Sequence, residues 1–369
     1  MEQVCKRQKR DFDEVTLEEL PDEIILKIFS SVNIRDLFQC MAVNKKIREI
    51  ANDQTLWNIM HLNGNDYEND LPAELLPRIL EKGCQYLSLF NCGIKAGKVR
   101  FANNFQLKYL SLHPESDESN DITLNVMPNL VASCHNLEKL CIKRLDIFYP
   151  EISHMEVKFF KCIIQNSETL KVLNLSQTHL SLASVQRIFL LCQHLLELNI
   201  SADHCLPTFN TRLCPHSVDF LCNNLTATIE KLDISDQHNF ADDQFKILIK
   251  RCNRITELSF LGTSVTDDSM NTIIETLSQS LVKLEPGPIS FHKKLELASM
   301  PKFKVLINSR LSEEEREGVR EILPNAKHED FDGELRIAEP YPDFDLDDEE
   351  SELIPNGFWE MKAKLRSYN

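Results

Sequence analysis

One aliphatic pattern recurs along most of this chain and limits the folds open to it. From residue 84 onward, leucine or a similar side chain fills the pattern L-x-x-L-x-L, a helix-like stretch follows, and the pattern returns. Its second position recurs between Leu87 and Leu306 with a mean spacing of about 27 residues, which indicates an array of stacked units. The copies are Cys84-x-x-Leu87-x-Leu89, Leu107-x-x-Leu110-x-Leu112, Leu137-x-x-Leu140-x-Ile142, Leu170-x-x-Leu173-x-Leu175, Leu195-x-x-Leu198-x-Ile200, Ile229-x-x-Leu232-x-Ile234 and Ile255-x-x-Leu258-x-Phe260, with weaker copies around Leu281/Leu284 and Phe303/Leu306.

Each copy has the spacing of a short strand with one buried side. Two aliphatic residues at a period of two face one side of a strand, and the residues between them face the other. A single strand cannot bury that side alone, so we expect a parallel sheet whose back is closed by helices. Helical stretches are clearest at 184–192, 242–250 and 267–275, and the last two open with acidic residues that suit a helix N-terminus. The pattern resembles leucine-rich repeats, which implies an α/β solenoid with strands on a concave face and helices on a convex face.

The 12 cysteines are expected to be reduced thiols, because the first residues are charged and lack the apolar core of a secretory signal. Cys134, Cys192 and Cys252 each lie three residues before the first aliphatic residue of a strand, as in the cysteine-containing subclass of leucine-rich repeats. We interpret them as small core side chains. The competing interpretation is a metal site, although its spacing departs from the paired ligands that zinc prefers. Its ligands would be His204, Cys205, Cys214 and His216. The sequence predicts no metal and no other cofactor.

Residues 20–57 are predicted to form three short helices. Pro21 suits the start of the first helix, Asn33 with Asp36 caps the second, and Asn44 opens the third. The segment carries more aliphatic side chains than about 40 residues can bury alone. We therefore expect some of them to need a second polypeptide to cover them.

This segment resembles an F-box. The resemblance rests on Leu20-Pro21, Glu23-Ile24, Asp36-Leu37, Val43, Lys45 and Leu56-Trp57, with Asn44 and Ile47 where the family often has Cys and Trp. An F-box followed by leucine-rich repeats implies a non-catalytic substrate-recognition subunit of an SCF (Skp-cullin-F-box) ubiquitin ligase. The F-box would dock on a Skp-type adaptor that leads to cullin and a RING subunit. By motif, the implied adaptor contacts are Leu20, Pro21, Ile24, Ile28, Leu37, Val43 and Trp57.

The repeats would hold a protein substrate, phosphorylated or unmodified, on the concave face. The side chains between the buried aliphatic residues are expected to form that face. The predicted substrate contacts are Tyr109, Lys139, Cys141, Lys143, Asn174, Asn199, Asp233 and Ser259. Lys139, Lys143 and Arg144 form a basic cluster. A phosphorylated substrate, an acidic segment of this chain or plain solvated charges are three interpretations of it.

Most of the net charge of -16 lies in one segment. Residues 329–352 contain 12 acidic residues and one basic residue, a net charge of -11, which leaves -5 for the other 345 residues. We interpret 329–369 as an acidic tail that either solubilises the protein or folds back on a positive surface, such as the concave face. Phe358, Trp359, Met361 and Leu365 favour docking. The stretches 333–340 and 358–365 are also similar to the tail of the S-phase kinase-associated F-box proteins, with Glu339 in place of an arginine.

The predicted organisation is a flexible segment at 1–15, an F-box at 16–60, a linker or cap at 61–83, repeats at 84–328 and the tail at 329–369. The acidic balance is unlike a nucleic-acid surface, and no apolar stretch is long enough for a membrane span, so we expect neither as a partner. No glycine-rich phosphate loop and no acid-base or nucleophilic constellation are present in the sequence. A basic run at Lys6–Arg10 is compatible with nuclear as well as cytoplasmic localisation.

Two classes of function remain open. The first is the ubiquitin ligase receptor described above, which recruits a target for ubiquitination and proteasomal degradation. The alternative is a leucine-rich repeat scaffold or inhibitor binding protein that acts without cullin, its F-box serving as a cap or an adaptor tether. Recovery of adaptor and cullin together favours the first, and recovery of adaptor alone favours the second.

Overall fold

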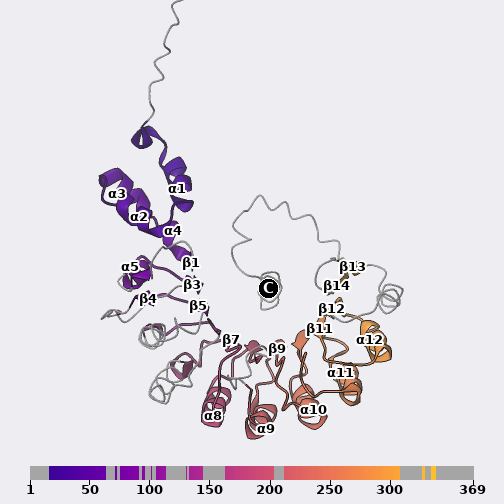
Figure 1. Cartoon of the computed structure of the whole chain (residues 1–369). Coiled ribbons are helices and arrows are strands. Elements are labelled where there is room, and N and C mark those ends of the chain that lie inside the picture. Colours follow the sequence, from indigo (N-terminus) through magenta and orange to yellow (C-terminus); the bar gives the residue numbers. More distant parts are fainter. Residues whose placement is uncertain are drawn as a thin grey trace, which may run out of the picture.

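The computed structural model describes residues 16–63, 71–72, 75–90, 94–95, 101, 105–113, 130, 133–143, 163–202, 212–307, 326–328 and 334–337. A small group of helices stands at one end of a curved array of strands (Figure 1). The strands line the inner side of the curve, and the helices that follow them lie on its outer side (Figure 1).

The N-terminal helices begin where their capping residues predict. Asn33 Oδ1 accepts a hydrogen bond from the Asp36 backbone N–H at 2.9 Å, and Asn44 Oδ1 accepts one from the Ile47 N–H at 2.8 Å. These bonds satisfy amide groups that lack partners in the first turn of a helix. The elements are η1 (Leu17–Glu19), α1 (Asp22–Ser30), α2 (Ile34–Cys40), α3 (Lys45–Ala51) and α4 (Thr55–Asn58). The short α4 was not predicted.

The parallel sheet contains every strand that the repeat predicts. The second leucine of one copy lies opposite the second leucine of the next, from Leu87 against Leu110 to Leu284 against Leu306. Because these leucines are buried, one apolar core runs along the array. The strands are β3 (Tyr86–Phe90), β5 (Tyr109–His113), β6 (Lys139–Ile142), β7 (Val172–Asn174), β8 (Glu197–Asn199), β9 (Lys231–Asp233), β10 (Glu257–Ser259), β11 (Lys283–Glu285) and β12 (Val305–Ile307). The predicted leucine-rich repeat solenoid is confirmed.

One further strand precedes the predicted ones. β1 (Ile59–Asn63) pairs with β3, and Met60 lies opposite Leu87. Trp57-x-x-Met60-x-Leu62 therefore occupies the positions of an additional copy, and all three side chains are buried. The helical segment thus runs directly into the sheet, and the boundary predicted at residue 60 falls inside β1.

The opposite edge of the sheet carries two antiparallel strands. β14 (Glu334–Ile337) pairs with β12, and β13 (Ala326–His328) pairs with β14. The predicted tail therefore begins next to a strand that belongs to the sheet. A separate pair of short parallel strands is formed by β2 (Leu71–Pro72) and β4 (Ile94–Lys95).

Helices on the outer side include the three predicted helical stretches at 184–192, 242–250 and 267–275. They are α5 (Leu75–Glu81), α8 (Leu182–Leu191), α9 (Pro215–Asn224), α10 (Asp242–Arg251), η5 (Asp267–Ser269), α11 (Met270–Leu277) and α12 (Phe291–Ala298). Cys134, Cys192 and Cys252 are buried behind the strands, as predicted for core side chains. Burial raises the pKa of Cys192 and that of Cys252 to about 12, so both thiols stay protonated and unreactive. Within the described ranges, no helix is both long enough and apolar enough to cross a bilayer.

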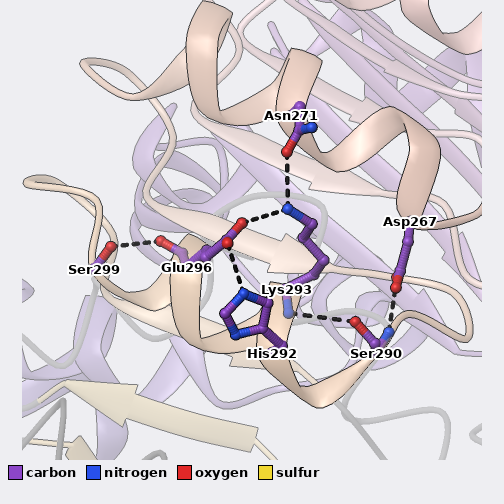
Figure 2. Close-up of polar contacts among 7 residues, drawn as sticks. All are labelled: Asp267, Asn271, Ser290, His292, Lys293, Glu296 and Ser299. Atoms are coloured by element: carbon purple, nitrogen blue, oxygen red, sulfur yellow. Dashed lines mark hydrogen bonds and ion pairs between the residues drawn. The ribbon is translucent and has the colours of Figure 1, made fainter.

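Two acidic residues at the start of outer helices tie one repeat to the next. Asp242 Oδ1 accepts a hydrogen bond from the Thr266 backbone N–H at 3.1 Å. Figure 2 shows the second bond, which Asp267 Oδ1 accepts from the Ser290 N–H at 2.8 Å. The Lys293 ammonium of α12 also reaches Asn271 Oδ1 of α11 at 2.8 Å (Figure 2). These bonds hold neighbouring helices in a fixed stagger over the sheet.

Candidate functional site

Helix α1 divides its apolar residues between two sides. Ile25 and Phe29 are 0% and 2% exposed and pack into the helical group, whereas Ile24 and Ile28 are 47% and 41% exposed. Residues four apart lie on the same face of a helix, so Ile24 and Ile28 form one uncovered stripe. The apolar residues of this helix are therefore divided between the core and the surface.

Two further apolar side chains of the helical group are exposed. Leu17 on η1 is 41% exposed, and Val43 before α3 is 68% exposed. We call Leu17, Ile24, Ile28 and Val43 the apolar face. Leu17 was not among the predicted contacts, although an aliphatic residue three positions before the Leu20-Pro21 pair was visible in the sequence.

A lysine of α3 fixes the elements that carry the apolar face. Lys46 Nζ donates hydrogen bonds to the backbone carbonyls of Glu18 at 2.8 Å and Leu20 at 3.1 Å. The same ammonium lies 3.2 Å from the Asp22 carboxylate at the start of α1. Consequently η1 and the beginning of α1 are both tied to α3. These contacts fix the positions of the elements that carry the apolar face.

The predicted adaptor contacts fall into two groups. Pro21, Ile24, Ile28 and Val43 are exposed, and Leu20 is half-buried. Leu37 and Trp57 are instead 3% and 0% exposed, so they do not belong to the surface. Trp57 Nε1 donates to the Ala51 carbonyl at 2.8 Å, and the Trp57 ring lies 5.0 Å from that of Phe38. The prediction that Leu37 and Trp57 contact the adaptor directly is wrong for these buried side chains, which belong to the core of the helical group.

The comparison with protein families decides what these helices are. Residues 17–63 match the model of the F-box-like family. The chain has an F-box-like domain. In the F-box-like domain the matched residues extend through β1, so the domain and the solenoid share that strand.

Solved structures with detectable similarity differ widely from this chain in sequence. One is a chain of the yeast Rad7 and Elc1 complex, 14% identical over 82% of this chain and 86% of that chain, with a TM-score of 0.40. Another is the leucine-rich repeat-containing protein LegL7 from Legionella pneumophila, 11% identical over 73% of this chain and 90% of that chain, with a TM-score of 0.35.

Contacts beyond β1 also join the F-box-like domain to the solenoid. The Arg78 guanidinium of α5 lies 3.9 Å from the centre of the Phe38 ring of α2. The Gln85 backbone N–H donates to the Asn58 carbonyl at 3.0 Å, which links the end of α4 to the start of β3. The apolar face therefore has a defined position relative to the first strands of the sheet.

The structure places most of the predicted substrate contacts out of reach of a large partner. Lys139 is exposed, and Tyr109 and Lys143 are half-buried. The other five, Cys141, Asn174, Asn199, Asp233 and Ser259, are buried. These five side chains occupy the position after the second leucine on neighbouring strands, and we call them the central column. The expectation that they form an open concave surface is therefore wrong.

Short-range hydrogen bonds explain why the column is buried. The Asn174, Asn199 and Asp233 side chains each accept a bond from the backbone N–H two residues later, at 2.9 to 3.0 Å. Bonds between neighbouring strands add to this, such as Asn199 Nδ2 to Asp233 Oδ2 at 3.2 Å and Ser259 Oγ to Glu285 Oε2 at 2.7 Å. The column is thus a polar ladder that stabilises the turns after the strands.

The residues just before the second leucine of each strand form a second column, and its charged side chains pair along the sheet. Lys231 on β9 lies 3.4 Å from Glu197 on β8 and 3.1 Å from Glu257 on β10. Burial lowers the pKa of Lys231, but the two carboxylates outweigh burial and the pKa is raised overall. Lys231 therefore stays charged, and its charge is already compensated by side chains of the solenoid.

A different set of lysines lies close to Glu138. Glu138 Oε2 accepts a hydrogen bond from Lys171 Nζ at 2.8 Å. The pKa of Glu138 is lowered chiefly by that bond, and the charges of Lys171, Lys108 and Lys139 lower it further. Three lysines thus surround one carboxylate at the start of β5, β6 and β7. Of the predicted cluster only Lys139 belongs to this set, because Lys143 is half-buried and Arg144 lies outside the described residues.

The competing metal site is only partly described. Cys214 is exposed, and its Sγ lies 3.1 Å from Ser217 Oγ. His204 and Cys205 fall outside the described residues. In the described part of the chain, no group of three or more His, Cys, Asp or Glu side chains is arranged to hold a metal ion.

Proposed function

We propose that this protein is the target-recruiting subunit of a ubiquitin ligase of the SCF type. The F-box-like domain binds a Skp-type or elongin-type adaptor, which brings cullin and a RING subunit. The solenoid holds the protein that becomes ubiquitinated. Proteins that combine an F-box with leucine-rich repeats are generally non-catalytic adaptors, and in this proposal the chain contributes binding and placement only.

The apolar face is the observation that supports this proposal most strongly. Ile24 and Ile28 are exposed one turn apart on a helix whose Ile25 and Phe29 side chains are buried. Burying such side chains against a partner releases about 1.5 to 3 kcal/mol for each fully covered aliphatic side chain. A second protein that covers Leu17, Ile24, Ile28 and Val43 together therefore gains binding free energy from one apolar cluster at the centre of the interface.

The function of a receptor follows from this geometry. Because the F-box-like domain continues into β1, an adaptor on the apolar face takes a defined position beside the solenoid. A target bound to the solenoid is then held near the ligase at a high effective concentration, which makes transfer to its lysines effectively intramolecular. Cytoplasmic and nuclear placement both fit such a role.

A charge substitution in the apolar face tests the proposal. In Ile24→Asp/Ile28→Asp, carboxylates replace the two exposed side chains of α1, so the adaptor interface would have to bury unpaired charges. We expect the Kd for a purified Skp-type adaptor to rise at least a hundredfold by isothermal titration calorimetry. We also expect co-purification of both adaptor and cullin from cells to be lost.

The chain itself offers a matched control. Leu190 and Leu191 on α8 are 55% and 45% exposed, so Leu190→Asp/Leu191→Asp makes the same chemical change on the outer side of the solenoid. This control should retain adaptor and cullin at wild-type levels. Recovery of adaptor without cullin by the wild-type protein would favour the scaffold alternative. Unchanged adaptor binding by the α1 variant would refute the proposed interface.

A further inference from the structure

One turn of the F-box-like domain carries no buried side chain. Leu17, Glu18 and Glu19 of η1 are all exposed, so no side chain of the turn is anchored in the core. Its internal bonds run from the Glu19 N–H to the Thr16 carbonyl at 3.0 Å and from the Leu20 N–H to the Leu17 carbonyl at 3.3 Å. A single turn loses more conformational freedom than so few bonds return. The position of η1 therefore depends on contacts with other elements.

Helix α3 supplies these contacts through two polar side chains. Lys46 Nζ lies within 3.2 Å of three oxygen atoms, namely the Glu18 and Leu20 carbonyl oxygens and Asp22 Oδ1. An ammonium group has three N–H donors, and these three acceptors match that number. Asn44 Nδ2 also donates a hydrogen bond to the Glu18 side chain. The segment from Glu18 to Asp22 thus places three oxygen atoms around one ammonium group.

The part of the apolar face on α1 is held in a different way. Ile24 and Ile28 lie on a helix that is anchored by the buried side chains of Ile25 and Phe29. That helix keeps its place through the core when a polar contact is lost. Leu17 lacks this support, because it lies on η1. Loss of the polar contacts to α3 should therefore displace Leu17 and leave the residues of α1 in position.

We propose that Lys46 is a positioning residue for adaptor binding, which acts by holding Leu17 in the apolar face. The inference rests on the proposed function, because it assigns a role within the same interface. Lys46 orders η1 in the free protein, so the adaptor does not have to order this turn when it binds. Such preorganisation raises affinity by lowering the entropy cost of association. Without the ammonium group, the cost of ordering η1 offsets part of the binding free energy that Leu17 contributes.

Hydrogen exchange of the free full-length protein tests the first step. Lys46→Met keeps the aliphatic stem of the side chain and removes its three donors. We expect the backbone amides of Glu19 and Leu20 to exchange about fivefold faster in this variant, because local order at η1 is lost. Amides in the last turn of α1 should keep their wild-type rates. Mass spectrometry of short overlapping peptides measures both sets, and equal exchange at η1 in wild type and variant would overturn the proposal.

The preceding residue of α3 supplies a matched control. The Lys45 side chain is 87% exposed, and its ammonium lies 3.8 Å from Glu49 on the same helix. Lys45→Met therefore makes the same chemical change one residue away without touching η1. The exchange rates at η1 and the Kd for the adaptor should both match the wild type in this control. An effect of Lys45→Met as large as that of Lys46→Met would mean that general charge, and not the contact with η1, is responsible.

Calorimetry with a purified Skp-type adaptor tests the second step. We expect Lys46→Met and Leu17→Ala each to raise the Kd about tenfold, the size that partial loss of one buried leucine predicts. If Lys46 acts through Leu17, the Kd of Lys46→Met/Leu17→Ala should lie within about twofold of either single variant. Lys46→Arg keeps the charge and the donors and should lie closer to the wild type than Lys46→Met does.

The outcomes separate this inference from the proposed function. Effects that multiply in the double variant would mean that Lys46 acts independently of Leu17, and would overturn the inference alone. Lys46→Met should also keep the wild-type urea midpoint by circular dichroism, because α1 and α3 retain their buried side chains. A lowered midpoint would assign Lys46 to the stability of the fold instead. If the wild type does not bind the adaptor, the proposed function fails, and the exchange rates still decide whether Lys46 orders η1.

Discussion

Trp57 shows how one residue serves both halves of the chain. It closes the core of the F-box-like domain through its contacts with Phe38 and the Ala51 carbonyl. It also fills the first position of the repeat pattern that continues through Met60 and Leu62. A motif suggested that Trp57 contacts the adaptor, but complete burial shows that its contribution is structural.

Substitutions of Trp57 should therefore act on stability first. Trp57→Ala leaves a large cavity and is expected to lower the free energy of unfolding by about 3 to 5 kcal/mol in urea. Trp57→Phe retains most of the volume but leaves the buried Ala51 carbonyl without its donor, so a loss of about 1 to 2 kcal/mol is expected. The Ile24→Asp/Ile28→Asp variant should stay close to the wild type in the same measurement, because both side chains are exposed. A Trp57→Ala protein as stable as the wild type would contradict the assignment.

At the scale of elements, the hydrogen bonds between α10 and η5 depend on the charge of one carboxylate and therefore on pH. The Asp242 carboxylate at the start of α10 accepts bonds from the Thr266 N–H, the Thr266 hydroxyl and the Ser269 hydroxyl of η5. Partial burial raises the pKa of Asp242, but these hydrogen bonds outweigh it and the pKa is lowered overall. The charged form is therefore the one that the fold stabilises.

Asp242→Asn isolates this charge at nearly constant shape. Because the pKa is depressed in the folded state, the stabilisation is present above the unfolded pKa of about 3.9 and is lost as the pH falls through the folded value. We expect the variant to unfold about 1 kcal/mol more easily at pH 7, and the difference to shrink below about pH 4. Urea titrations of both proteins at several pH values measure this. If the difference in unfolding free energy between the two proteins does not change with pH, the charge of Asp242 does not contribute to stability.

The sequence predicted the elements that neighbouring residues specify. It did not predict those that depend on contacts between distant parts of the chain. Asn33 and Asn44 start helices through their own side chains, and the leucine positions fix the strand register, so both were visible in the sequence. The strand β1 was not predicted, because Trp57 and Met60 replace the aliphatic residues that usually fill the repeat pattern. β14 pairs with a strand formed about 30 residues earlier, which no local pattern encodes.

The candidate site shows the same division. The exposure of Ile24 and Val43 follows from a surplus of apolar residues in a short helical segment, which sequence alone reveals. The burial of Asn174, Asn199 and Asp233 depends on hydrogen bonds to the following turn, and these require the folded backbone. The similarity of residues 333–340 and 358–365 to the S-phase kinase-associated F-box proteins stays a prediction, since only β14 of those stretches is described.

In the part of the chain that the structure describes, the strands form a linear array in which each strand pairs with its neighbours, and the F-box-like domain is joined to it through β1. Ten parallel strands follow in order from β1 to β12 among the described residues. In such an array stability is close to a sum of nearest-neighbour terms, so damage spreads less with distance. The F-box-like domain should therefore sense a lesion in β3 more strongly than one in β12.

Two equivalent leucines test this transmission. Leu87 on β3 and Leu306 on β12 occupy the same repeat position and are both fully buried, so replacing either with alanine should cost about 2 to 5 kcal/mol locally. In a Trp359→Phe background, fluorescence reports Trp57 alone, while circular dichroism reports the whole fold. We expect Leu87→Ala to lower the Trp57 unfolding midpoint markedly. Leu306→Ala, nine strand pairings from β1, should lower it much less. Equal shifts of the Trp57 midpoint would mean that the array unfolds as one block, in which case the adaptor-binding end would lose its structure whenever any part of the solenoid fails.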